Sequence, residues 1–266
     1  MTLIEPAFDP FGPVPPLDLP CGVNFGGGVN STALLLIMHD QGFRPDWVVF
    51  SDTGSERPET YENVEIVEKW CKKVGFPFAT TRWTRKDGSF EPVHANCLRL
   101  AWLPSKAYGF SGCTTKWKIQ PLQKWRKEHG FTPSTVCIGY DAGEERRLKK
   151  AKARHQCQGM DPEKSMDEVV WYPLVGWGID RKLCVDRILA QGWLPSKSAC
   201  FCCPSAKPAE WVALRKDYPE LFDICKRIQT TAEEAGHAES KNLFRAYDPA
   251  NPTCVCTADG CLVRTL

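Results

Sequence analysis

The sequence lacks long hydrophobic runs, and no stretch approaches the roughly 20 consecutive apolar residues that a bilayer-spanning helix needs. A secretory signal is also lacking, because residues 1–21 contain Glu5, Asp9 and Asp18 but no lysine or arginine and no extended apolar segment. The net charge is only +2, which argues against a protein that coats nucleic acid through bulk charge. These absences predict a soluble, cytoplasmic protein with reduced thiols and no membrane association.

Cysteine, in contrast, is abundant, with 14 residues. In a reducing compartment such a number favours metal or cluster ligands over disulfides. Four cysteines fall at apolar positions of expected helices or strands and are expected to be small core residues: Cys71, Cys137, Cys184 and Cys225. The spacing Cys-x-x-Cys of Cys200 and Cys203 lets two thiolates reach one metal centre, which could be zinc or an iron-sulfur cluster.

Strand and helix signals alternate from Cys21 to Trp83, which predicts a doubly wound α/β fold with a parallel sheet. The expected strands are 22–25, 47–50, 78–83, 135–139 and 171–174, and the expected helices are 31–41, 58–74, 181–191 and 208–235. Residues 85–121 are expected to form short helices and loops, the charged segment 144–168 a mobile loop, and residues 251–266 a tail without clear period. The predicted domains are a Pro-rich, poorly ordered arm (1–20), a nucleotide-binding α/β domain (21–178) and a helical, cysteine-rich C-terminal extension (179–266).

A glycine-rich turn follows the first expected strand. It reads Phe25-Gly26-Gly27-Gly28-Val29-Asn30-Ser31-Thr32 and opens a helix. Glycines let the backbone approach a phosphate closely, and the amides of a helix N-terminus favour an anion. A tight connection capped by Ser31 is the simpler alternative, but open parallel sheets bind ligands at this edge. The turn therefore predicts a phosphate site that differs from a Walker loop, since no Gly-Lys-Ser/Thr follows.

The second expected strand ends in Ser51-Asp52-Thr53-Gly54, which brings an acid and a hydroxyl to the same edge. Asp52 is expected to bind Mg²⁺ or ribose, whereas Glu59 is expected to cap the next helix. Two basic segments, residues 116–127 and 146–155, would attract phosphates, although most of their lysines suit a solvated helix face.

These motifs together resemble the phosphoadenosine phosphosulfate reductase-like branch of the PP-loop ATP pyrophosphatases, near the sulfurtransferases of DNA phosphorothioation. Residues 25–31 look like the Ser-Gly-Gly-x-Asp-Ser PP-loop, and residues 51–61 are similar to the Asp-Thr-Gly and Pro-Glu-Thr-Tyr signature. Residues 113–122 and 138–146 match two later segments of that branch in the same order. Gly26 and Asn30 depart from the pattern, because they replace the loop serine and the loop aspartate.

The resemblance implies an adenine nucleotide alpha-hydrolase-like fold, and it implies the site residues. It implies that ATP, with Mg²⁺, contacts Phe25, Gly26, Gly27, Gly28, Ser31, Thr32, Asp52, Thr53 and Gly54. The residues expected to act in catalysis are Asn30, Asp52, Lys118 and Arg146, the last two beside the nucleotide. It further implies a [4Fe-4S] cluster, or alternatively Zn²⁺, at Cys113, Cys200 and Cys203, with Cys97 as the candidate fourth ligand because Thr114 stands where the family has a second cysteine.

The function predicted from this resemblance is adenylation of an acceptor by ATP with release of pyrophosphate, in support of sulfur transfer to nucleic acid, with a cysteine desulfurase as a sulfur donor. One alternative is a sulfonucleotide reductase, whose C-terminal Glu-Cys-Gly-Leu-His signature is absent. A second alternative is a non-catalytic nucleotide-binding module, which the missing loop carboxylate favours. The sequence leaves open the acceptor, the metal, the oligomeric state and the role of Cys254, Cys256 and Cys261.

Overall fold

The computed structural model describes residues 9–15, 18–158, 167–238, 241–245, 247–249, 254–257 and 260–263. The chain forms two compact units that interleave along the sequence. Unit 1 comprises Met1–Ser51, Pro58–Thr81 and Leu122–Ser198, and unit 2 comprises Asp52–Arg57, Arg82–Pro121 and Ala199–Leu266. Each compact unit is made of several separate segments of the chain. The predicted division into consecutive domains 1–20, 21–178 and 179–266 stays a prediction.

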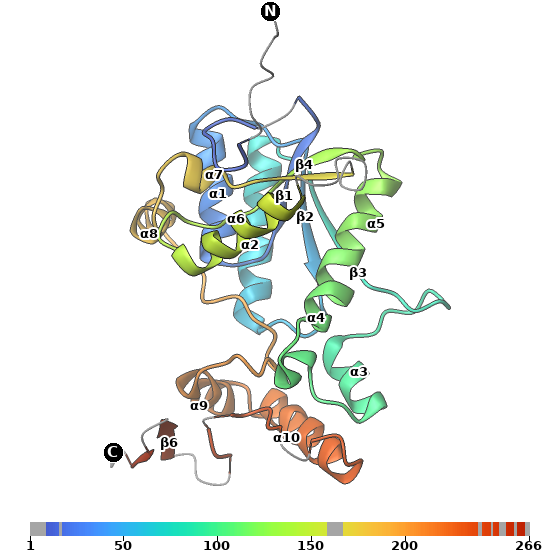
Figure 1. The fold of residues 1–266 in the computed structure, drawn as a ribbon. Helices are drawn as coiled ribbons and strands as arrows, with labels where there is room; N and C mark the ends of the chain where they lie inside the picture. The colour runs from blue at the N-terminus through green and yellow to red at the C-terminus, as the bar shows by residue number, and fades with distance from the viewer. Residues whose placement is uncertain are drawn as a thin grey trace, which may run out of the picture. The chain divides into compact units, whose positions relative to one another are not determined.

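A five-stranded sheet with the order β3-β2-β1-β4-β5 forms the centre of unit 1 (Figure 1). Its strands are β1 (Cys21–Phe25), β2 (Trp47–Asp52), β3 (Phe78–Arg82), β4 (Ser134–Cys137) and β5 (Glu168–Trp171). β1 runs parallel to β2 and to β4, and β4 runs parallel to β5. The final residues of β2 and β3, Asp52 and Arg82, are assigned to unit 2. The first four predicted strands are thereby confirmed.

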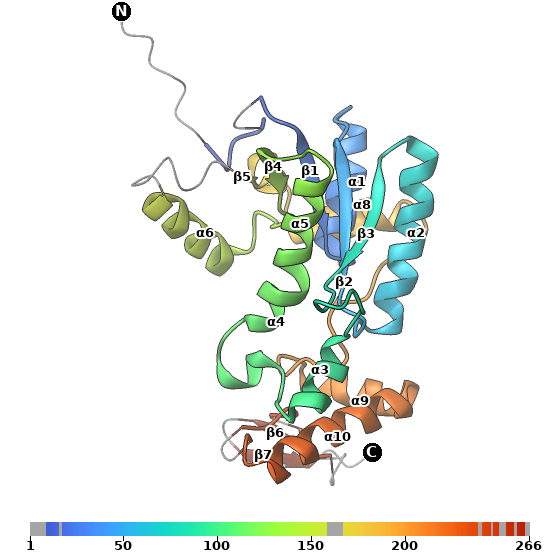
Figure 2. The same cartoon turned by 90° about the vertical axis from the view of Figure 1, so that its right-hand side faces the viewer.

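Helices cover both faces of this sheet because the side chains of β2 alternate between two apolar clusters. Val48 and Phe50 belong to the cluster that includes residues of α1 (Val29–Asp40), α2 (Pro58–Val74) and α8 (Arg181–Leu189). Trp47 and Val49 belong to the opposite cluster with Leu122 of α5 (Gln120–Glu128). Figure 2 shows α2 and α5 on opposite sides of the sheet. This arrangement confirms the predicted doubly wound α/β class.

Two expectations for unit 1 are wrong. The charged segment predicted as a mobile loop contains α6 (Glu145–Gln158), because its lysines, arginines and alanines favour helix even where apolar periodicity is weak. The last strand ends at Trp171, since Pro173 lacks an amide donor and opens α7 (Pro173–Gly176). Within the Pro-rich arm, the Pro10 carbonyl accepts a hydrogen bond from the Tyr172 amide at 2.9 Å, and the poor order expected of the arm stays a prediction. Residues 1–8, 16 and 17 of that arm lie outside the described residues.

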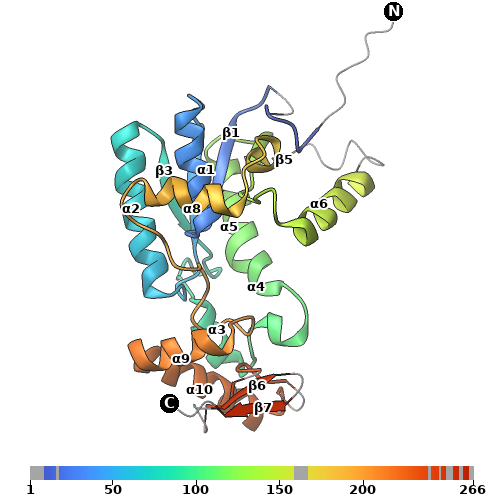
Figure 3. The same cartoon turned by 90° about the vertical axis from the view of Figure 1, so that its left-hand side faces the viewer.

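Unit 2 is largely helical (Figure 3). Its elements are α3 (Val93–Leu100), η1 (Ser105–Tyr108), α4 (Gly112–Thr114), η2 (Thr115–Ile119), α9 (Pro208–Asp217), α10 (Pro219–Glu234), β6 (Cys254–Thr257) and β7 (Gly260–Val263). Trp211, Phe222 and Phe244 lie in its apolar core. The single helix predicted over 208–235 is wrong, because Pro219 ends α9 and begins α10. The tail, residues 251–266, was expected to have no regular secondary structure, but it contains the antiparallel strands β6 and β7.

The four cysteines predicted to be core residues, Cys71, Cys137, Cys184 and Cys225, are all fully buried, which confirms that interpretation. Across the part of the chain that the structure describes, no helix combines the length and apolar character that crossing a bilayer requires.

Candidate functional site

The turn between β1 and α1 carries the predicted phosphate-binding residues. Gly28 holds the N-cap position of α1 in an extended conformation. The Ser31 hydroxyl accepts a hydrogen bond from the Gly26 amide at 3.3 Å and donates one to the Gly28 carbonyl at 3.1 Å. The first amides of a helix have no intrahelical acceptor and lie at its positive end. The turn is therefore suited to bind an anion.

Asn63 of α2 holds this turn in shape. Its side-chain amide donates to the Gly27 carbonyl and to the Thr32 hydroxyl, both at 3.0 Å, and its oxygen accepts from the Trp193 indole at 3.1 Å. Gly27 has a φ of 69°, in the left-handed region where a side chain is strained. Sequence reasoning missed Asn63, because nothing local to α2 indicates that it contacts a turn 31 residues earlier.

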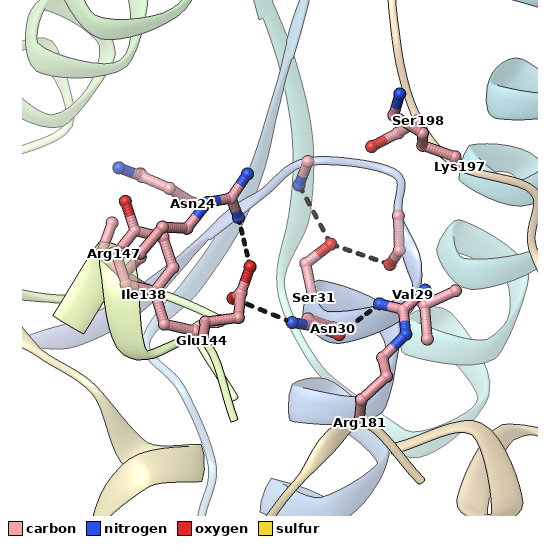
Figure 4. Close-up of a pocket in the computed structure, with 14 residues that line it drawn as sticks. Asn24, Val29, Asn30, Ser31, Ile138, Glu144, Arg147, Arg181, Lys197 and Ser198 are labelled. Atoms are coloured by element: carbon pink, nitrogen blue, oxygen red, sulfur yellow. Dashed lines mark hydrogen bonds and ion pairs between the residues drawn. The ribbon is translucent and has the colours of Figure 1, made fainter. Parts of the chain in front are cut away.

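A pocket of about 340 Å³ opens beside the turn (Figure 4). Gly26, Gly28, Asn30 and Ser31 line it, as the phosphate-site prediction requires. Three cations also line it, Arg147 from α6, Arg181 from α8 and Lys197. All of the lining residues belong to unit 1.

Two other predicted loop residues point into the protein core. Phe25 is 3% exposed and contacts the rings of Phe50 and Phe78. Thr32 is 1% exposed, with its hydroxyl bound by Asn63. Their side chains are therefore structural, and any contact that they make with a nucleotide would come from the backbone.

Asn30 connects the turn to the segments that carry the pocket's charges (Figure 4). Its side-chain nitrogen donates to Asp141 Oδ2 at 2.8 Å and to Glu144 Oε2 at 3.2 Å. Its oxygen accepts from Arg181 Nη1 at 2.6 Å. Arg147 Nη1 in turn donates to Glu144 Oε1 at 2.7 Å. The loop has no carboxylate at position 30, but the carboxylates of Asp141 and Glu144 face the Asn30 side chain.

Asp52, Thr53 and Gly54 belong to unit 2. Asp52 accepts a hydrogen bond from the Gly54 amide at 2.7 Å and forms an ion pair with Arg82 at 3.2 Å. The Thr53 hydroxyl donates to Glu56 Oε1 at 3.1 Å. The role of these three residues toward a nucleotide or Mg²⁺ stays a prediction.

The two predicted catalytic cations have different surroundings. Lys118 Nζ forms an ion pair with Glu56 Oε1 at 2.9 Å, and the Glu56 side chain is fully buried. Burial disfavours the Lys118 ammonium, but the Glu56 carboxylate, together with the nearby Cys200 and Cys203, more than offsets burial, so that the pKa of Lys118 is raised. Arg146 is exposed on α6, and its neighbour Arg147 lines the pocket. Sequence reasoning missed Glu56, Arg181 and Lys197; Arg147 was one residue from the predicted position.

All four predicted metal ligands, Cys97, Cys113, Cys200 and Cys203, belong to unit 2. The Cys203 amide donates to the Cys200 carbonyl at 3.1 Å, which closes the Cys-x-x-Cys turn. The Cys200 thiol lies 3.4 Å from the Thr53 hydroxyl, and the Cys113 thiol accepts from the Ser105 hydroxyl at 3.0 Å. Burial raises the pKa of Cys97 to about 12 and holds that of Cys200 well above its ordinary value.

A thiophilic metal fits this donor set in its chemistry, because all four side chains are thiols of one unit and burial disfavours the thiolates of Cys97 and Cys200 without a cation to stabilise them. In the ranges that the structure describes, no three His, Cys, Asp or Glu side chains are grouped as a metal site. Cluster ligation by these cysteines therefore stays a prediction. The side chains of Cys254, Cys256 and Cys261 lie outside the described residues.

Comparison with known proteins gives the following likenesses. No protein-family model matches the chain. An uncharacterized nin region protein of Escherichia phage lambda is 32% identical over 168 residues, which cover 56% of this chain and 58% of that protein. An uncharacterized protein of Methanocaldococcus jannaschii is 22% identical over 236 residues, which cover 86% of this chain and 44% of that protein. The chain thus spans about half the length of these curated relatives.

Among solved structures, the U34-tRNA thiolase NcsA from Methanococcus maripaludis with its [4Fe-4S] cluster is similar, with a TM-score of 0.48 and 11% sequence identity. The match covers 81% of this chain and 73% of the thiolase chain.

Proposed function

We propose that this protein binds ATP in the pocket of unit 1 and transfers its adenylyl group to an acceptor, with release of pyrophosphate, in support of sulfur transfer to nucleic acid. The observation that carries the proposal is the glycine-rich turn, which lines a pocket together with basic side chains. Glycines, an N-terminal helix end and cations at one edge of a parallel sheet suit a polyphosphate better than they suit an uncharged ligand.

In the proposed reaction an acceptor oxygen attacks the α-phosphorus of ATP, and the bond from this phosphorus to the pyrophosphate oxygen breaks. The amides of the turn and the pocket's cations hold the phosphates and meet the charge that develops on them. Asn30 is the loop residue nearest to the acidic side chains, and Asp52, Lys118 and Arg146 are proposed to assist in catalysis. Mg²⁺, when bound with ATP, neutralises part of the phosphate charge.

Cys97, Cys113, Cys200 and Cys203 are proposed to hold a [4Fe-4S] cluster, or alternatively Zn²⁺. Iron bound there would supply a thiophilic centre for the handling of sulfur. A cysteine desulfurase is the proposed source of that sulfur, and a nucleic acid is the proposed acceptor.

The second candidate is a nucleotide-binding module without turnover. Asn30 favours it, because an amide binds a magnesium-nucleotide complex less strongly than a carboxylate. The facing carboxylates of Asp141 and Glu144 favour turnover instead.

Incubation of the anaerobically purified full chain with α-labelled ATP, Mg²⁺ and a nucleic acid tests the proposal. Adenylated product or AMP, together with pyrophosphate, is the expected result. ATP binding without any turnover would favour the module, and reduction of adenylyl sulfate in a parallel assay would identify a sulfonucleotide reductase.

The metal is tested separately by iron analysis and by the visible spectrum of the anaerobic protein. Iron with broad visible absorption is expected, and a colourless zinc protein would support the alternative. The double variant Cys200→Ala/Cys203→Ala should lose the metal, while Cys71→Ala, at a fully buried core position of unit 1, should keep it.

A further inference from the structure

Arg181 is a pocket residue whose position is set by the fold. It is the first residue of α8, and the preceding Asp180 caps that helix by accepting a hydrogen bond from the Leu183 amide at 2.8 Å. Cys184 and Ile188 of α8 are buried in the same core cluster as α1. Because α8 is anchored in this core, the backbone of Arg181 is fixed relative to the glycine-rich turn.

Asn30 holds the Arg181 side chain at the pocket. The guanidinium donates to Asn30 Oδ1 at 2.6 Å, so that its hydrogen-bond acceptor is a neutral amide oxygen. An amide does not neutralise the guanidinium charge, and this hydrogen bond uses one of five N–H donors. Arg147 differs, because its donor at 2.7 Å meets the Glu144 carboxylate. Among the residues that the structure describes, Arg181 is thus the pocket arginine that forms no ion pair, so its charge is available to an anion.

The identity of residue 30 follows from the same network. The Asn30 nitrogen donates to Asp141 and to Glu144, at 2.8 and 3.2 Å. An aspartate at this position would lose both donors and bring a third carboxylate against two others, which is unfavourable. The carboxamide of Asn30 satisfies the arginine through its oxygen and the carboxylates through its nitrogen.

We infer that Arg181 binds phosphate oxygens of the nucleotide and that Asn30 positions it for this role. The inference rests on the proposed function, since it concerns how the same pocket recognises ATP. A guanidinium presents paired donors that match a phosphate group, and such charge-assisted bonds are roughly twice as strong as neutral ones.

The test is the affinity of the full-length protein for ATP, measured by calorimetry, in the variants Arg181→Gln and Lys182→Gln. Both changes remove one positive charge from the first turn of α8. Lys182 is the matched control because its side chain is 80% exposed and forms an ion pair with Asp186 at 2.5 Å. We expect Arg181→Gln to weaken ATP binding by about tenfold or more, whereas Lys182→Gln changes it by less than about twofold.

A second pair of variants tests the positioning role. Asn30→Asp should also weaken ATP binding, and Asn30→Asp/Asp141→Asn should recover part of the loss, because an amide at position 141 can donate to the new carboxylate at position 30 and leaves Glu144 as the one carboxylate that still opposes it. Arg181→Lys keeps the charge without the planar fork and should fall between the wild type and Arg181→Gln. Circular dichroism of each variant verifies that it is folded.

The outcomes separate the inference from the function on which it rests. If the wild type binds no ATP, the proposed function fails and the inference fails with it. If the wild type binds ATP but Arg181→Gln matches Lys182→Gln, ATP binding stands and the role of Arg181 is overturned. If Asn30→Asp binds as tightly as the wild type, the positioning role of Asn30 is overturned.

Discussion

Single residues determine the shape of the phosphate turn. Asn63 is 2% exposed and satisfies the Gly27 carbonyl, the Thr32 hydroxyl and the Trp193 indole at once. Buried polar groups are costly when they lack partners, so this side chain stabilises one conformation of the turn over others. Adjacent glycines of the turn therefore differ in what they tolerate.

We predict that Gly27→Ala is damaging and that Gly26→Ala is not. An alanine at position 27 would have to adopt a positive φ of 69°, and its methyl group would lie 2.8 Å from Thr60 Cγ2. At Gly26 the nearest neighbour of such a methyl group is Ser31 Oγ, at 3.9 Å. Gly27→Ala should lower the free energy of unfolding by about 1–3 kcal/mol in urea titrations and weaken ATP binding. Equal stability of the two variants would contradict this account of the turn.

At the scale of elements, the N-terminus of α8 places a capping residue directly before a residue that lines the pocket. Asp180 provides the capping side chain, and the next residue is Arg181. Because a cap defines where a helix begins, it also defines the direction in which the first side chains leave the helix.

We expect Asp180→Ala to reduce stability by about 1 kcal/mol, the usual cost of a lost N-cap. It should also weaken ATP binding through Arg181. Asp180→Ser retains a capping oxygen and serves as the control, which should remain near the wild type in both measurements. Chemical denaturation and calorimetry check the two effects, and an unchanged stability of Asp180→Ala would count against the cap.

Glu91, two residues before the start of helix α3, is hydrogen-bonded to side chains of that helix. Glu91 accepts hydrogen bonds from Arg99 Nε at 2.5 Å and from Asn96 Nδ2 at 2.7 Å. The Arg99 hydrogen bond, opposed by burial and aided by Asn96, lowers the pKa of Glu91 below its ordinary 4.5. A carboxyl group with a lowered pKa stabilises the fold in its ionised form, and that contribution is lost as the pH falls through the folded-state pKa.

Glu91→Gln should therefore lower the free energy of unfolding by about 1–3 kcal/mol near neutral pH. The difference from the wild type should shrink at pH values well below 4.5, where the wild-type carboxyl is protonated as well. Glu65→Gln is the control, because its partner Lys69 is 80% exposed and such surface pairs contribute little. Urea unfolding over a range of pH measures both variants; a gap that persists in acid would argue against the ionised Glu91 network.

At the scale of the whole molecule, the two units carry different chemistry. The residues that line the phosphate pocket lie in unit 1, and the four candidate metal ligands lie in unit 2. A ligand that binds the native state stabilises the part of the structure that it contacts.

ATP should therefore slow hydrogen exchange mainly in unit 1. We expect added protection of amides in α1 and at the start of α8, with smaller changes in α10 of unit 2. Hydrogen exchange read by mass spectrometry, with and without saturating ATP, makes this comparison. Protection confined to unit 2 would place the nucleotide elsewhere.

Much of unit 1 could be predicted from the sequence because its signals are local. The buried strand β2 begins with the continuous apolar run 47–50, and α2 shows the spacing of an amphipathic helix. The segment 144–168 was misjudged because α6 has mostly basic and polar residues, so that its helix propensity leaves no apolar stripe. The break at Pro219 was also a local signal, and the prediction of one continuous helix overlooked it.

The sequence by itself determined the alternation of strands and helices, the glycine-rich turn and the buried cysteines, since these depend on neighbours along the chain. Only the tertiary structure decided which charges reach the turn. Arg181 lies 151 residues from Asn30, and Asp141 lies 111 residues from it, so that packing of α8 and of the β4–α6 connection had to bring them together. A hydrogen bond forms only between atoms about 3 Å apart in space. The spacing of residues along the sequence does not reveal such a contact when its partners are more than a hundred residues apart.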